Sequence, residues 1–240
     1  MRPIAIGLTA ALALAALVPA TVISAAKDKE KPAAVDKAVE TFGGIDICVN
    51  NASAISLTGT LSTDMKRYDL MHQINGRGTF LTSRICLPHL KKAANPHILA
   101  LSPPLDIKPR WFAPHVAYSM AKYNMSLCML GLAEEFRSDG VACNALWPRT
   151  AIATAAIQFA LTGEEGLKHC RTVEIMADAA HAMFLKPSRE FTGQFVIDDT
   201  FLYAEGVRDF DKYRVDPTAA LMPDFFVPED SVPPPGVVIG

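Results

Sequence analysis

The chain has 240 residues, half of them hydrophobic, and a formal net charge of −2. This length and apolar content suffice for one domain with a buried core. Because the charge is near neutral and no block of Lys or Arg is present, the sequence argues against nucleic acid or an anionic membrane surface as a partner. It favours a small, largely uncharged substrate.

The placement of cysteine and histidine argues against a metal site. The five cysteines are odd in number and scattered, without a C-x-x-C pair, and no two of the six histidines have metal-ligand spacing. Unpaired thiols also fit a reducing compartment better than an oxidising one. We predict no metal and no disulfide framework.

The first 26 residues are apolar apart from Arg2 and a few hydroxyl side chains, and a charged run begins at Lys27. One interpretation is a secretory signal or membrane anchor. The other is a buried helix over residues 6–17 that ends near Pro19, followed by a short β-branched strand at 21–23. Both interpretations are open at this point.

Further along the chain, helical and strand-like segments alternate. A helix is predicted over 33–42, and it ends at Gly43, a residue that favours a left-handed cap. A strand follows at 45–49, then a long amphipathic helix over 63–90 and a buried strand at 97–101.

The second half continues the alternation, which predicts an α/β fold built on a parallel sheet. The remaining elements are a Pro-rich loop, a long helix and two strands, at residues 103–114, 116–137, 141–146 and 195–197. Residues 227–240 are rich in proline and hold too few core residues to fold. We therefore expect one domain over 1–226 and a loose Pro-rich tail after it.

Tyr118 and Lys122 are four residues apart in a predicted helix, so they share one face. A phenol titrates at about pH 10 and is a poor acid or base at neutrality. An adjacent cation stabilises the phenolate and lowers the pKa of the phenol towards the working range. By itself this spacing is weak evidence, because Y-x-x-x-K also arises by chance on solvated helix faces.

Four further features accompany the pair. They are an N-N-A-S turn after a strand, an asparagine in the long helix, a serine that closes the next strand, and a proline with two threonines after the strand at 141–146. These positions are Asn50–Ser53, Asn75, Ser102, Pro148, Thr150 and Thr154. Together with Tyr118 and Lys122 they resemble the short-chain dehydrogenase/reductase family, from about Ala33 to Phe226.

The resemblance implies a Rossmann-type, doubly wound parallel sheet with helices on both faces. It also implies hydride transfer between NADP, with NAD as the alternative, and a carbonyl or alcohol. Tyr118 would donate or accept the proton, Lys122 would lower the pKa of the phenol and hold the nicotinamide ribose, and Ser102 would orient the substrate oxygen. Asn75 would hold a relay water, and the cofactor would contact Asn51, Ala52, Ser53, Pro148, Thr150 and Thr154.

The active site departs from the family pattern at two places. Pro103 stands where a second serine is usual, and the step from Ser102 to Tyr118 is longer than usual by a few residues. A strand-capping hydroxyl is therefore the alternative role for Ser102. Arg149 replaces the glycine that follows the family's proline, so the backbone beside the nicotinamide can be arranged differently.

The largest departure lies upstream. The family's T-G-x-x-x-G-x-G loop, whose backbone N–H groups approach the cofactor pyrophosphate, does not occur in the sequence. Gly7 resembles the end of that loop, and residues 1–27 resemble a remnant of the first helix and second strand. Lys27 resembles the side chain that selects the 2′-phosphate of NADP. We therefore expect a fold that is incomplete in its N-terminal half. An inactive truncated pseudoenzyme or interaction fragment is the alternative function.

Several stretches, residues 42–57, 144–151, 191–198 and 223–226 among them, resemble one subgroup of the family. Its members join the reductase-like domain to a lipid-carrier domain and are associated with lipid or fatty-acid metabolism in peroxisomes or mitochondria. The resemblance implies that location and a small apolar substrate, with the secretory pathway or a membrane as the alternative location. It also implies a homo-oligomer packed through the helices at 63–90 and 116–137.

Overall fold

The computed structural model describes residues 33–158 and 163–240. The four strands of this part form one parallel sheet in the order β1-β2-β3-β4. They are Ile47–Asn50 (β1), His97–Leu101 (β2), Ala142–Trp147 (β3) and Phe195–Ile197 (β4). The helix and strand that the family resemblance places within residues 1–27 lie outside the described residues.

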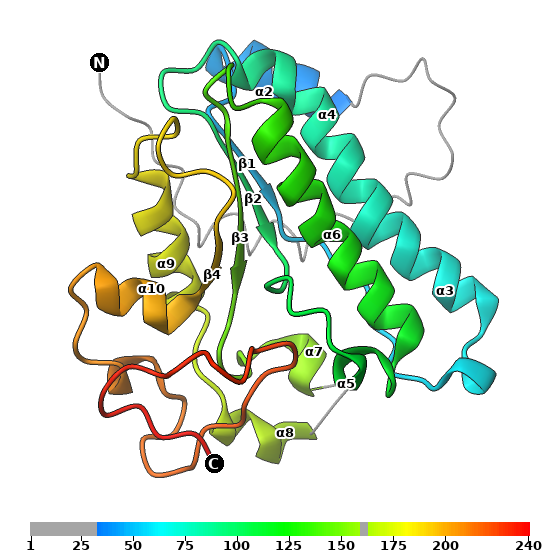
Figure 1. Ribbon diagram of the computed structural model, residues 1–240, viewed down its shortest axis with the longest axis vertical. Coiled ribbons are helices and arrows are strands. Elements are labelled where there is room, and N and C mark those ends of the chain that lie inside the picture. The colour runs from blue at the N-terminus through cyan, green and yellow to red at the C-terminus, as the bar shows by residue number, and fades with distance from the viewer. Residues whose placement is uncertain (1–32, 159–162) are drawn as a thin grey trace.

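Helices connect the strands and continue after the last one (Figure 1). The α-helices are α2 (Ala33–Phe42), α3 (Met65–His72), α4 (Gly78–Leu90), α5 (Pro109–Phe112), α6 (Val116–Glu135), α7 (Ala155–Ile157), α8 (Gly163–Gly166), α9 (Glu174–Phe184) and α10 (Asp198–Ala204). A π-helical turn, η2 (Gln73–Arg77), joins α3 to α4. Short 3-10 turns are η1 (Thr60–Ser62), η4 (Leu167–His169) and η5 (Asp211–Tyr213).

Alternate residues of the strands face opposite sides of the sheet, as the pleat requires. Ile98 and Ala100 of β2 belong to an apolar cluster with residues of α4 and α6. Leu99 belongs to a second cluster with residues of α9 and α10. Figure 1 shows α4 and α6 on one side of the sheet and α9 and α10 on the other. The predicted α/β fold, a parallel sheet with helices on both faces, is confirmed.

The helix predicted over 33–42 and its left-handed cap are confirmed, since Gly43 has a φ of 84° and its N–H donates to the Val39 carbonyl at 2.9 Å. The long helix predicted over 63–90 is instead divided. It starts after Asp64, whose side chain accepts from the Lys66 N–H, and the five-residue turn η2 interrupts it. Asn75 therefore lies in a π turn, a feature that is frequent at functional sites.

The C-terminal part is more ordered than the sequence pattern indicates. Helices α9 and α10 are not predicted from the sequence. Residues 227–240, where we expect a loose tail, form no helix but lie against the domain. Val237 packs against the cluster around α9, and the Gly240 N–H donates to the Leu221 carbonyl at 2.9 Å. The domain boundary at Phe226 stays a prediction.

Candidate active site

Helix α6 brings Tyr118 and Lys122 to the carboxyl end of the sheet. Both side chains are buried, with exposed fractions of 6% and 5%. Lys122 Nζ donates to the carbonyl of Leu101, the last residue of β2, at 2.8 Å. It also lies 5.0 Å from the ring centroid of Trp147, the last residue of β3. The pair therefore stands where parallel sheets bind their ligands.

Burial controls the ionisation of this pair. It lowers the pKa of Lys122 from 10.5 to about 8, an effect that the carboxylate of Asp224 partly opposes. Burial, and to a lesser extent Asp224, raises the pKa of Tyr118 above its ordinary range. Lys122 is not among the groups that shift the pKa of Tyr118 in the protein by itself, so its predicted effect on the phenol stays a prediction.

Asp224 is a third ionisable group of the site. Its N–H donates to the Arg149 carbonyl at 2.9 Å, which places it beside the chain that leaves β3. Burial raises the pKa of Asp224 to about 7, although the Phe225 N–H and Lys122 both favour the carboxylate. Sequence reasoning did not select this residue for a role. The only signal was the stretch at 223–226 that resembles the subgroup.

Ser102 follows β2, as predicted, and is fully buried. Its Oγ finds no hydrogen-bond partner among the described residues. The next turn is fixed independently, because Ser126 Oγ donates to the Pro103 carbonyl at 2.7 Å. Buried hydroxyls without a partner are uncommon. This geometry suits an oxygen that meets a ligand better than one that caps the strand.

Asn75 ties the π turn η2 to the loop after β1. Its Nδ2 donates to the Ala54 carbonyl at 3.0 Å, and its Oδ1 accepts from the Ala54 N–H at 2.7 Å. The amide therefore holds the loop, and its predicted role towards a relay water stays a prediction. In the same loop Asn51 is half-buried, whereas Ala52 and Ser53 are exposed.

The predicted cofactor residues after β3 differ in their surroundings. Pro148 and Thr150 are buried, and Thr150 Oγ1 finds no partner in the described part of the chain. Thr154 is exposed at the start of α7 and makes no side-chain capping bond. The structure thus buries Thr150 at the site and leaves Thr154 at the surface. Gly7 and Lys27 lie outside the described residues.

Arg149 enters a buried ionic network, which explains how it replaces a glycine. Its Nε donates to Asp199 Oδ1 at 2.7 Å, and Arg171 Nη1 donates to Asp199 Oδ2 at 3.0 Å. The Arg149 N–H donates to Asp198 Oδ1 at 2.9 Å. Burial, followed by the charge of Asp199, raises the pKa of Asp198 to about 7.

Within residues 33–158 and 163–240, three polar groups near the carboxyl ends of β2 and β3 remain available to a ligand. They are the Ser102 hydroxyl, the Thr150 hydroxyl and the Lys122 ammonium, which has three donors and one close oxygen acceptor. Unpartnered buried hydroxyls are costly unless something else completes them. The residues present therefore fit the polar groups of a nicotinamide cofactor and of a carbonyl or alcohol substrate.

The comparisons with known proteins agree with this geometry. Residues 7–196 match the family described as Enoyl-(Acyl carrier protein) reductase. The solved structure of a putative dehydrogenase from Xanthomonas campestris is 55% identical and has a TM-score of 0.79 over 82% of this chain and 72% of that chain. A short chain dehydrogenase from Mycobacterium thermoresistibile is 49% identical, with a TM-score of 0.78 over 87% of this chain and 73% of that one. The chain belongs to the short-chain dehydrogenase/reductase family.

Within the short-chain dehydrogenase/reductase family, the chain is similar to Hydroxysteroid dehydrogenase-like protein 2. The protein of that name from Danio rerio is 59% identical over 88% of this chain and 51% of its own length. The stretches at residues 42–57, 144–151, 191–198 and 223–226 resemble the sequence of this subgroup. The chain spans about half the length of this relative.

Proposed function

We propose that the chain is an oxidoreductase unit that transfers a hydride between NADP and a carbonyl or alcohol of an apolar substrate. The observation that carries the proposal is the buried Tyr118–Lys122 pair on α6, at the same end of the sheet as the hydroxyls of Ser102 and Thr150, which find no partner among the described residues. Members of the short-chain dehydrogenase/reductase family generally use NAD or NADP. The activity of the longer relatives, of which this chain spans about half, is part of the proposal.

Each side chain has a separate task. NADPH, when bound, supplies the hydride. Tyr118 donates the proton to the substrate oxygen in reduction and accepts it in oxidation, while Ser102 donates a hydrogen bond that orients that oxygen. Lys122 uses the donors that Leu101 leaves free to hold the ribose, and its ammonium offsets charge that develops on the phenol.

NADP is preferred to NAD on the basis of Lys27, which would contact the 2′-phosphate. Pro148 and Thr150 would face the nicotinamide amide, and Thr154 would contact the same end of the cofactor from the surface. The open loop at Asn51–Ser53 would contact the adenosine side. Gly7 would lie at the pyrophosphate.

Aromatic side chains around the phenol support an apolar substrate. The Tyr118 ring belongs to a buried cluster with Trp147 and Phe226, and Trp111 and Leu105 pack against this cluster. Such walls favour a lipid, fatty-acid or steroid-like body over a polar one.

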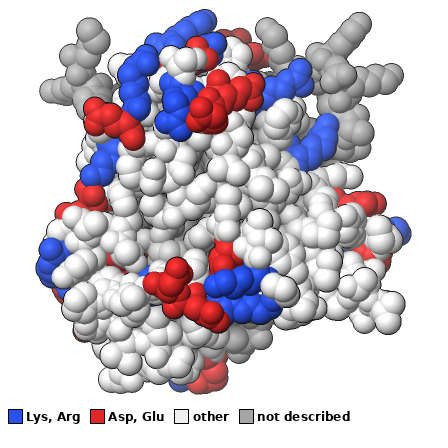
Figure 2. Space-filling view, in the orientation of Figure 1, with Lys and Arg blue, Asp and Glu red and all other residues white. Residues whose placement is uncertain are grey.

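The outer surface of α6 supports self-association. Met120 and Leu127 are exposed and line a groove of about 400 Å³ with Tyr68 and His72 of α3. Figure 2 shows a largely uncharged area over the middle of the molecule, with charged side chains at the upper edge, along both sides and in one lower group. A homo-oligomer packed through the helices at 63–90 and 116–137, which include α3, α4 and α6, would cover such apolar surface.

The cellular location rests on resemblance alone. Peroxisomes or mitochondria stay the prediction, with the secretory pathway or a membrane as the alternative. Among residues 33–158 and 163–240, no helix has the length and apolar character needed to cross a membrane.

Titration of the purified chain with NADPH, followed by fluorescence, tests the proposal. We expect saturable micromolar binding by the wild type and by Tyr118→Phe, which keeps the ring and removes only the hydroxyl. Lys122→Met is expected to lose binding. Turnover of an apolar ketone should disappear in Tyr118→Phe.

A folded sample that binds neither NADPH nor NADH would overturn the proposal. It would support a pseudoenzyme or interaction fragment, for which the missing T-G-x-x-x-G-x-G loop is the favouring observation.

A further inference from the structure

A segment beyond the family match returns to the active site. The match covers residues 7–196, whereas residues 222–232, here called the C-terminal strap, follow it in the chain. In Figure 1 the end of the chain, in red, runs back across the lower end of the sheet. Three hydrogen bonds, at 2.9, 2.9 and 2.6 Å, join the strap to the end of β3 and the loop after it: Ala151 N to Met222 O, Asp224 N to Arg149 O, and Trp147 Nε1 to Phe225 O.

The far end of the strap is tied as well. Arg149 Nη1 donates to the Ser231 carbonyl at 2.7 Å, and Arg149 Nη2 donates to Ser231 Oγ at 3.0 Å. Glu229 forms salt bridges with Arg110 of α5 and with Lys108 just before it. Because both ends are tied, the residues between them are held against the site.

Phe226, between these ties, has an unusual backbone conformation. Its φ is 66°, in the left-handed region that bulky residues rarely adopt. Its side chain is 2% exposed, and its ring centroid lies 6.1 Å from that of Tyr118 and 5.8 Å from that of Trp147. Strained backbone of this kind concentrates at functional sites and persists where the surroundings enforce it.

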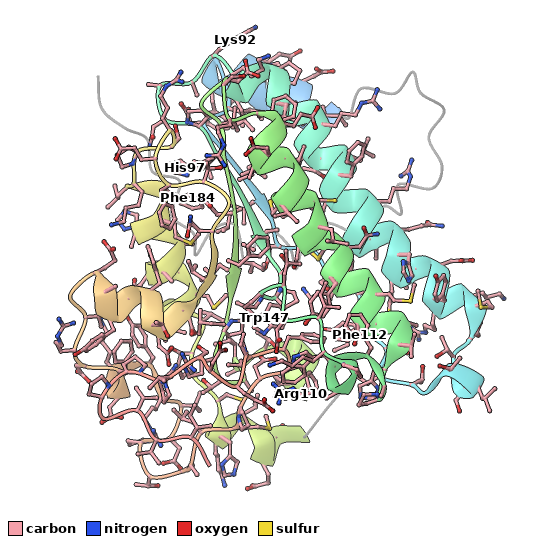
Figure 3. All side chains as sticks on the ribbon, viewed as in Figure 1. Lys92, His97, Arg110, Phe112, Trp147 and Phe184 are labelled. Carbon is pink, nitrogen blue, oxygen red and sulfur yellow. The ribbon has the colours of Figure 1, made fainter. Side chains whose placement is uncertain are left out.

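The position of the phenol dictates what a substrate must touch. A substrate oxygen bonded to Tyr118 Oη lies about 2.6 to 3.2 Å from it. The carbon atoms next to that oxygen are then near the rings that surround the phenol, those of Phe226 and Trp147. Tyr123 extends this aromatic surface, 5.3 Å from Phe226. Figure 3 shows Trp147 and Phe112 at this same end of the sheet.

We infer that Phe226 is a specificity-determining residue, whose ring forms the wall that contacts the apolar body of a carbonyl or alcohol substrate. The inference rests on the proposed function for the chemistry and adds the substrate class, which is bulky and apolar. It also makes the strap a part of the reductase unit.

Binding of the neutral fluorescent probe N-phenyl-1-naphthylamine tests the wall without a catalytic step. Phe226→Ala is compared with the conservative Phe226→Leu and with Phe225→Ala, whose ring is 38% exposed and packs towards His115. We expect Phe226→Ala to weaken binding about tenfold or more, Phe226→Leu about threefold, and Phe225→Ala hardly at all. Melting curves check that each variant is folded.

Equal or tighter binding by a folded Phe226→Leu or Phe226→Ala would overturn the inference, and so would a wild type that does not bind the probe. Turnover separates the inference from the proposed function. Phe226→Ala should reduce the preference for 2-decalone over cyclohexanone about tenfold through KM, with kcat little changed. If the probe binds as expected but no variant turns over NADPH, the proposed function is contradicted and the inference about Phe226 is still supported.

Discussion

Two buried cations lie near the same end of the sheet in different surroundings. The Arg149 guanidinium meets the Asp199 carboxylate at 2.7 Å and oxygens of Thr200, Ser231 and Val232. The Lys122 ammonium meets one carbonyl oxygen, at 2.8 Å, and a thioether sulfur at 3.9 Å. Within the described residues, the protein satisfies the charge and the donors of the arginine, whereas it leaves donors of the lysine free.

The two cations have different roles: Arg149 stabilises the fold, whereas Lys122, in the part of the chain that the structure describes, is free to bind a ligand. A buried charge costs free energy unless partners replace its lost hydration. Arg149 has these partners and holds the C-terminal strap in place. Among the described residues, Lys122 has one carbonyl acceptor and the charge of Asp224, which do not fully offset its burial, so the fold bears a cost that a ligand can reduce.

The largest effect is expected at Arg149. Arg149→Met leaves the Asp199 carboxylate with less compensation and frees Ser231, so the free energy of unfolding should fall by about 3 to 5 kcal/mol. Urea unfolding measures this loss. The control is Arg208→Met, because Arg208 is exposed and contacts its near neighbours in the chain, the carbonyls of Tyr203 and Val207 and the Tyr203 ring. A similar loss in both variants would contradict the role of the network.

The same change at Lys122 should act in the opposite direction. Since burial lowers the pKa of Lys122 from 10.5 to about 8, the unfolded chain binds the proton more tightly, and the ammonium form disfavours folding below pH 8. Lys122→Met should raise the free energy of unfolding at pH 7 by about 1 to 3 kcal/mol. The gap should close as the pH rises from about 8 towards 10.5. Thermal melts over this range test the sign, and a less stable variant at pH 7 would show that Lys122 is structural.

The effect of Asp224 on the free energy of unfolding should depend on pH. Burial raises its pKa from 3.8 to about 7, so the carboxylate disfavours the folded state above pH 7 and has no effect below pH 4. Asp224→Asn should therefore be more stable than the wild type above pH 7, by about 1 to 2 kcal/mol. The difference should shrink as the pH falls towards 4. Melting temperatures at several pH values measure it, and a gap that does not change with pH would refute this account.

The smallest effects are expected at two serines. Ser126 Oγ donates to the Pro103 carbonyl, and Ser102 Oγ has no partner among the described residues. Ser126→Ala should lower the free energy of unfolding by about 1 kcal/mol, whereas Ser102→Ala should leave it unchanged or raise it slightly. Ser102→Ala alone should impair turnover. Chemical denaturation and kinetics on both variants separate the two roles.

The elements that the sequence predicts well are those with a local signal. The helix over Ala33–Phe42 has regular spacing and a glycine stop, and the strands at His97–Leu101 and Phe195–Ile197 are short apolar runs. The Tyr118–Lys122 pair is also local, because four residues always return to the same helix face.

The rest of the site depends on contacts between distant residues. Arg149 and Ser231 are 82 positions apart, and nothing in the periodicity of either segment links them. Asp224 and Phe226 lie in a Pro-rich stretch without helical or strand spacing, so only its resemblance to a subgroup marked it. The raised pKa of Tyr118 could not be predicted either, because burial is a property of the folded packing, not of the helix spacing.

The π turn at Gln73–Arg77 has a consequence for how this chain tolerates sequence change. A π turn contains one residue more than an α-helical turn. Deleting a single residue there would let α3 and α4 join into one regular helix, but it would rotate Asn75 away from Ala54, to which both ends of its amide are bonded. An insertion or deletion that improves the helix would thus release the loop after β1. A redesign that made this helix regular would therefore disturb the loop that Asn75 holds beside the site.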